Sequence, residues 1–285
     1  MKFGIAFANA GPFADPEMFA HLVTTAESVG IESIWTVEHV LVPCGYESTY
    51  PYSPEGKMPG PEDSPIPDPF VALSFAAALT RKIRLATGVL ILPQRHPAYV
   101  AKEVASLDVI SGGRVILGIG VGWLKEEFDA LGVPFADRGS RTRESVEAMR
   151  SLWSPGPSTY QGKCFSWNKV ESNPKPVQGA NVPIVVGGHA DLAARRAARY
   201  GNGFFPGRGS AARMKELIGI LHEECSKVGR KPAEIELTGG MMMPDKDYVS
   251  RYEEMGFERL VIAPPGYDRD GISRGFEAFA EAFLK

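Results

Sequence analysis

The chain has 285 residues, of which 44% are hydrophobic and 23% are charged, and its formal net charge is −3. This composition is typical of a globular protein with a full-sized core, and the charge gives no electrostatic argument for nucleic acid or an anionic membrane as partner. We find no signal-peptide region and no apolar run of the roughly 18 to 20 residues that span a bilayer. Three widely spaced cysteines, Cys44, Cys164 and Cys225, favour reduced thiols in a cytoplasmic protein.

Apolar runs typical of buried strands alternate with amphipathic stretches typical of helices along the whole chain. The predicted strands cover residues 2–8, 32–37, 83–90, 114–118, 182–186, 203–205, 234–241 and 259–262. The predicted helices cover residues 15–30, 68–80, 99–110, 138–152, 191–200, 211–228, 247–255 and 273–284. Eight such units predict one domain, residues 1–285, with the fold of a (β/α)₈ TIM barrel, which typically needs about 250 residues. An open doubly wound sheet is the alternative, but its nucleotide-binding glycine motif does not follow the first strand.

Two stretches interrupt this alternation. Residues 43–67 are rich in Pro, Tyr and Gly and show no periodicity. Loops of this length inside a compact domain are usually functional, so we expect this long loop after strand 2 to cover the barrel mouth as a lid. Residues 156–176 predict a small hairpin inserted before strand 5 and outside the barrel.

Ionisable residues and glycines gather where predicted strands end, which in a TIM barrel is the face that carries the chemistry. Glu38 and His39 end strand 2, where a histidine is suited to proton transfer near neutral pH. The plain alternative is a polar strand end that hydrogen-bonds a loop. Thr87, Gly88 and Val89 end strand 3, and a glycine there indicates a bulge or a close backbone approach.

Two glycine-rich turns follow strands 4 and 5. The first contains Gly120, Val121, Gly122 and Trp123, and the second contains Gly187, Gly188 and His189. Backbone N–H groups of such turns, next to a helix N-terminus, are suited to binding phosphate. A tight turn without a ligand is the alternative for each of them, and no His, Asp or Glu cluster has the spacing of a metal site.

With these motifs assembled, the chain resembles the bacterial luciferase-like superfamily, and within it the branch that uses coenzyme F420. The resemblance rests on the sequences at residues 33–39, 85–89, 95–97, 112–123 and 183–188. It implies a luciferase-like TIM barrel, a homodimer, and a flavin or deazaflavin ring in the barrel mouth.

The resemblance also implies roles for individual residues. Thr87, Gly88 and Val89 correspond to a strand-3 bulge, often with a cis peptide at the bond matching Gly88–Val89, that supports the ring. The two glycine turns correspond to the phosphate cradle, formed by Gly120, Val121, Gly122, Trp123, Gly187, Gly188 and His189. His39 corresponds to an acid/base beside the ring, with Glu38 orienting it or contacting the ring. Family sugar-phosphate dehydrogenases have a catalytic Glu where this chain has Trp123, which favours a bulkier or more apolar substrate.

The resemblance therefore implies an F420-dependent oxidoreductase that moves hydride between C5 of the deazaflavin and a small organic substrate. An FMN-dependent monooxygenase, supplied with reduced flavin by a separate reductase, is the first alternative. A flavin- or deazaflavin-binding protein without turnover is the second. The acidic tail of F420 would favour cations near the mouth, for which Arg95 and Arg208 are candidates.

Overall fold

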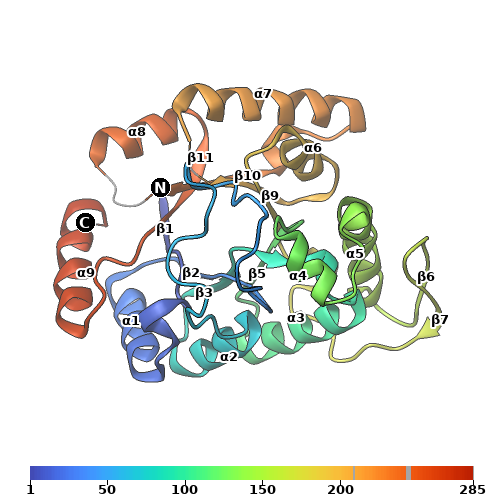
Figure 1. Ribbon diagram of the computed structural model, residues 1–285, viewed down its shortest axis with the longest axis horizontal. Coiled ribbons are helices and arrows are strands. Elements are labelled where there is room, and N and C mark those ends of the chain that lie inside the picture. Colours follow the sequence, from blue (N-terminus) through green and yellow to red (C-terminus); the bar gives the residue numbers. More distant parts are fainter. Residues whose placement is uncertain (208, 242–244, 285) are drawn as a thin grey trace.

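Eight parallel strands close into a barrel that is surrounded by helices (Figure 1). The computed structural model describes residues 1–207, 209–241 and 245–284. The barrel strands are β1 (Lys2–Ile5), β2 (Ser33–Thr36), β3 (Arg84–Thr87), β5 (Val115–Gly120), β8 (Ile184–Gly187), β9 (Gly203–Gly207), β10 (Glu236–Met241) and β11 (Phe257–Ile262). Pairing of β1 with β11 and of β3 with β5 completes the ring, so the predicted (β/α)₈ barrel is confirmed.

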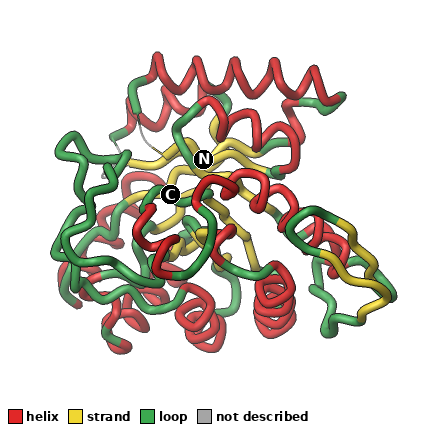
Figure 2. The backbone as a smooth tube through the Cα atoms, turned by 45° about the vertical axis from the view of Figure 1, so that its right-hand side comes forward, coloured by secondary structure: helices red, strands yellow, loops and turns green. Residues whose placement is uncertain are grey.

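Helices form the outer layer, seen as red coils around the yellow strands in Figure 2. They are α1 (Pro16–Val29), α2 (Pro69–Leu79), α3 (Pro97–Ser111), α4 (Lys125–Ala130), α5 (Arg138–Trp153), α6 (Asp191–Tyr200), α7 (Ala211–Val228), α8 (Lys246–Glu254) and α9 (Arg269–Phe283). Short 3₁₀ turns occur at Gly11–Ala14, Leu92–Gln94, Phe135–Asp137, Gly179–Asn181 and Pro232–Glu234. No helix of the described ranges is both long and apolar enough to cross a membrane.

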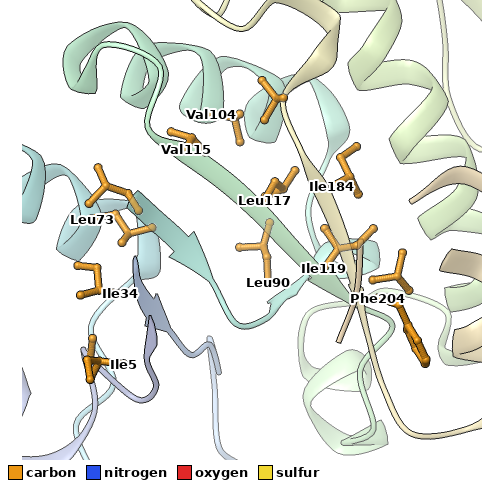
Figure 3. Packing of buried hydrophobic residues seen from close by; sticks show 14 of the residues in the cluster. Ile5, Ile34, Leu73, Leu90, Val104, Val115, Leu117, Ile119, Ile184 and Phe204 are labelled. Carbon is orange, nitrogen blue, oxygen red and sulfur yellow. The ribbon is translucent and has the colours of Figure 1, made fainter. Parts of the chain in front are cut away.

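The strands bury both faces, which explains their continuous apolar sequences. On β5, Val115, Leu117 and Ile119 belong to the large core between the barrel and its helices. Figure 3 shows Val115 near Val104 of α3, and Ile119 further along the strand near Phe204. The intervening Ile116 belongs to a smaller cluster inside the barrel. That inner cluster consists of Trp35, Ala86, Ile116, Val185 and Val261, with Ala6 and Phe205 against it.

Both predicted interruptions of the repeat are present. Between β2 and α2 the chain forms no helix or strand and passes over the barrel (Figure 1). We call residues 40–67 the lid. The predicted hairpin is formed by the antiparallel strands β6 (Ser158–Gln161) and β7 (Ser166–Val170), which project away from the barrel beyond α5 (Figure 1).

The structure differs from the prediction at two strands, the one expected at residues 83–90 and the one expected at residues 114–118. The expected strand 83–90 is interrupted, because β3 ends at Thr87 and the chain resumes pairing with β5 only at β4 (Leu90–Ile91). The bond between Gly88 and Val89 is cis, so the expected bulge and cis peptide are confirmed. Strand β5 continues to Gly120, two residues beyond its predicted end, and the six-residue helix α4 was not predicted.

Candidate active site

The bulge after β3 is packed against both glycine-rich strand ends. Val89 lies between β5 and β8, since a Cβ placed on Gly120 or on Gly187 would lie 2.6 Å from a methyl carbon of Val89. The bulge also packs against the cluster inside the barrel, since a Cβ on Gly88 would lie 3.0 Å from the Trp35 ring. The predicted residues of these three strand ends are therefore brought together, as one packed layer at the barrel mouth.

This packing changes the interpretation of the first glycine turn. Gly120 has to be glycine because of Val89, with or without a bound phosphate. Gly122 has a positive φ of 79°, and a side chain there would clash with Phe128 and Ile91. The N-terminus of α4 is covered by the lid, because the Lys125 N–H donates to Ser48 Oγ at 3.1 Å. Packing thus accounts for the glycines of this turn.

The second turn, after β8, leaves room for a ligand. Gly188 has a φ of 128°, which disfavours any residue with a side chain. The adjacent His189 has a buried Nδ1 atom without a hydrogen-bond partner among the described residues. Burial, assisted by the nearby Arg213, lowers the pKa of His189, so a neutral ring is favoured. A cavity of about 330 Å³ lies beside it, lined by Pro51, Tyr52, Ser53, Pro54 and His189.

His39 is held by a buried carboxylate that the sequence did not single out. Its Nδ1 atom lies 3.0 Å from Glu127 Oε2, and the Glu127 side chain is 0% exposed. The other carboxylate oxygen accepts the N–H groups of Val40 at 2.7 Å and Leu41 at 3.1 Å. Burial raises the pKa of Glu127, but hydrogen bonds from His39 and Leu41 outweigh it, so the pKa lies below its ordinary value.

Glu38 does not orient His39, so that part of the expectation is wrong, and its contact with a bound ring stays a prediction. Its carboxylate accepts the Ile91 N–H at 2.5 Å and a hydrogen bond from Arg95 Nε at 2.7 Å. Burial raises the pKa of Glu38, although Arg95 and the Ile91 N–H oppose the shift. Glu38 and His39, which follow the end of β2, therefore bind different partners although they are adjacent in the sequence.

Arg95, a candidate for binding an acidic tail, is already surrounded by carboxylates. Besides Glu38, it contacts Asp68 at 2.5 Å and Glu103 at 3.6 Å. Its charge is therefore neutralised within the protein. The other candidate, Arg208, lies outside the described residues.

A series of aromatic contacts, made largely by the lid, runs across the mouth from His39 to His189. Trp123 contacts His39 with a ring-centre distance of 5.7 Å, and also contacts Tyr46 at 5.4 Å and Tyr50 at 5.1 Å. Tyr52 continues the run from Tyr50 to the ring of His189 at 4.8 Å. A second cavity of about 430 Å³ lies at the His39 end, and its lining includes Glu38, His39 and Val40.

The lid is fixed by side chains that the sequence analysis missed. The buried Asn9, which follows β1, donates to the carbonyl oxygens of Val37 and Pro67 at 2.9 and 2.7 Å. Glu126 of α4 accepts the N–H groups of Glu47 and Ser48. Glu126 and Glu127 resemble ordinary acidic residues at a helix start, so the sequence carried no signal for these contacts. The described residues contain no cluster of His, Cys, Asp or Glu suited to a metal ion.

Comparison with known proteins identifies the family. The model of the luciferase-like monooxygenase family matches residues 1–243. An uncharacterised protein of Mycobacterium tuberculosis is 32% identical over 96% of this chain and 97% of its own length. The F420-dependent glucose-6-phosphate dehydrogenase of Kineococcus radiotolerans is 30% identical over 81% of this chain and 64% of its own length.

Solved structures agree on the fold. An F420-dependent secondary alcohol dehydrogenase superposes with a TM-score of 0.80 at 18% identity, covering 99% of this chain and 98% of that one. The monooxygenase RslO1 of Streptomyces bottropensis gives a TM-score of 0.77 at 23% identity, with 100% and 99% covered. The chain therefore belongs to the luciferase-like monooxygenase family, as the sequence predicted, and it is an oxidoreductase.

Proposed function

We propose that this protein is an F420-dependent oxidoreductase that transfers hydride between the deazaflavin C5 and a small organic substrate, with His39 as the acid/base. The observation that carries the proposal is the position of His39. It lies at the barrel mouth, lines a cavity, and is held by a buried carboxylate through Nδ1. Such an arrangement suits proton transfer at the other ring nitrogen.

The residues of the mouth fit a flavin-type cofactor. The buried and unpartnered Nδ1 of His189, next to the positive-φ Gly188, provides a polar position for the phosphate-bearing chain. The bulge at Gly88–Val89 would support the ring, with Thr87, Gly120, Val121, Gly122, Trp123 and Gly187 around it. When bound, coenzyme F420 supplies a hydride donor or acceptor. The protein's own residues position the substrate, exclude water and move the proton.

Trp123 defines the chemistry available next to His39. Where sugar-phosphate dehydrogenases of the family have a catalytic carboxylate, this chain presents an indole ring that packs against Tyr46 and Tyr50. An indole supplies no acid or base for the reaction. The proposal therefore assigns proton transfer to His39 and a substrate less polar than a sugar phosphate.

Two measurements test the proposal. Titration of the purified protein with F420 and with FMN, followed by fluorescence, should show tighter binding of F420. His39→Ala should lower kcat by about 10²- to 10⁴-fold, since positioned proton transfer typically contributes this much. The cofactor Kd should change only a few-fold, because the proposed phosphate contacts are on other strands. His222→Ala, a change in helix α7, is a matched control. Wild-type turnover of a stable His39→Ala variant would remove His39 from the mechanism.

The alternative function is that of an FMN-dependent monooxygenase, which the family match and the RslO1 structure support. Preferential binding of FMN, and turnover that needs oxygen and a separate flavin reductase, would establish it. We also propose a homodimer and a cytoplasmic location, as the resemblance and the reduced cysteines suggest. Light scattering of the purified protein tests the homodimer.

A further inference from the structure

We propose that Glu127 is a positioning residue that sets the tautomer of His39, so that Nδ1 carries the proton and Nε2 is the atom that exchanges protons with substrate. This inference rests on the proposed function of His39. It adds a residue outside the strand-end motifs and states which ring nitrogen acts. Three features of the structure carry it.

The first feature is the number of donors around the Glu127 carboxylate. Oε1 accepts two backbone N–H groups, those of Val40 and Leu41. Oε2 faces Nδ1 of His39 at 3.0 Å. A carboxylate in its charged form only accepts hydrogen bonds, and the two backbone N–H groups that donate to Oε1 stabilise this form. The atom facing Oε2 must then be a donor, so the proton of a neutral His39 lies on Nδ1.

The second feature is the freedom of the opposite ring atom. No hydrogen bond joins Nε2 of His39 to any residue in the described part of the chain. His39 lines the cavity of about 430 Å³ at this end of the mouth. The ring packs against Trp123 in a T-shaped arrangement with an interplanar angle of 82°, which restrains its rotation. Nε2 is therefore the ring nitrogen left to accept or donate a proton.

The third feature is that the same carboxylate fixes the first residues of the lid. Val40 and Leu41 follow His39 directly, and both donate to Glu127. These two backbone donors also determine how a glutamine would sit at this position. Its carbonyl oxygen would face them, and its NH₂ group would face Nδ1 of His39. Nδ1 would then have to accept, which moves the ring proton to Nε2 and blocks the atom that acts as base.

The experiment compares Glu127→Gln with the neighbouring Glu126→Gln. Glu126 anchors the lid through Glu47 and Ser48 but does not contact His39. ¹⁵N NMR of histidine-labelled protein, without cofactor or substrate, reports which ring nitrogen carries the proton, and the His39→Ala spectrum assigns the signal. We expect protonation on Nδ1 in wild type and in Glu126→Gln, and on Nε2 in Glu127→Gln.

Kinetics supply the second measurement. Glu127→Gln should lower kcat about 10²- to 10⁴-fold, the range for loss of positioned proton transfer, with KM and the cofactor Kd changed only a few-fold. In a Ser-His-Asp hydrolase the corresponding carboxylate-to-amide change acts through the wrong tautomer in this way. Any loss in Glu126→Gln measures lid anchoring alone. Glu127→Asp, which keeps the carboxylate, should retain the Nδ1 proton and part of the activity.

Several results would overturn the inference: a wild-type proton on Nε2, an unchanged tautomer in Glu127→Gln, or wild-type kcat after the tautomer has switched. The wild-type spectrum alone decides the first of these, even if Glu127→Gln does not fold. Because the tautomer is measured without turnover, failure of this inference is distinguishable from failure of the proposed function, which would appear as full activity of His39→Ala.

Discussion

The two ends of the barrel both contain buried charges, but they use them differently. At the N-terminal ends of the strands, Arg259 is 1% exposed and donates to both oxygens of Glu32 at 2.8 and 2.9 Å, and to Glu236. This group is closed, because each charge has its partner inside the protein. At the mouth, His39 has one nitrogen held and one free, and Nδ1 of His189 has no partner among the described residues. Charges are paired at both ends, as Arg95 and Glu38 show for the mouth, and the mouth differs in the two histidine nitrogens that are left open beside its cavities.

The largest expected effect on stability is at the closed end. Arg259→Ala should lower the free energy of unfolding by about 3 kcal/mol, because it removes a buried cation and leaves the half-buried carboxylates of Glu32 and Glu236 without their partner. Urea unfolding measures this loss. Arg269→Ala is the control, since that exposed arginine lies 3.7 Å from Glu17 and should change stability by about 1 kcal/mol or less. Equal stability of the two variants would show that the group around Arg259 does not stabilise this end of the barrel.

A smaller effect is expected at the open end, on ligand binding. A side chain on Gly188 would force a strained backbone and alter the turn beside His189. Gly188→Ala should therefore weaken cofactor binding about tenfold, equivalent to about 1.4 kcal/mol, as measured by fluorescence titration. Gly156→Ala, with a φ of 78° and open space around it, controls for the backbone strain. Gly120→Val is not a clean test, because it would clash with Val89. Unchanged affinity in folded Gly188→Ala would exclude a phosphate at this turn.

The smallest expected effect is a pH dependence of the lid. Hydrogen bonds from Ser48, assisted by the Glu47 N–H, lower the pKa of Glu126 to about 2. Because this pKa is depressed, the stabilisation is present above the ordinary value of about 4.5 and is lost as the pH falls from there towards 2. Protection of the Ser48 amide against hydrogen exchange, corrected for intrinsic rates, should decrease over this range. Glu126→Gln should show weak protection already at pH 7. A pH-independent protection factor would contradict this.

The architecture could be predicted because the signals for strands and helices lie in residues that are close together in the sequence. Strand and helix periodicity, and Asp15 with Pro16 at a helix start, depend on neighbouring residues, and the structure places them as expected. For the candidate site, the sequence indicated the residues at the strand ends, because their motifs lie where predicted strands end. Glu127 and Asn9 act over 88 and 28 residues of separation, and nothing next to them in the sequence indicates their partners. The adjacency of Glu38 and His39 was misleading, because Glu38 binds Ile91 and Arg95 whereas His39 binds Glu127.

The hydrogen bonds of Asn9 to Val37 and Pro67 determine which changes in the lid the barrel can tolerate. One side chain ties the chain at Val37 to the chain at Pro67, so the intervening loop begins and ends at nearly one point. Doubling the length of a closed loop costs only about 0.6 kcal/mol in entropy. Insertions, deletions or replacements within residues 42–66, which follow His39 and the Glu127-bound Val40 and Leu41, should therefore leave the barrel intact. Exchanging residues 42–66 between relatives offers a route to new substrates while His39 and its contact with Glu127 stay in place.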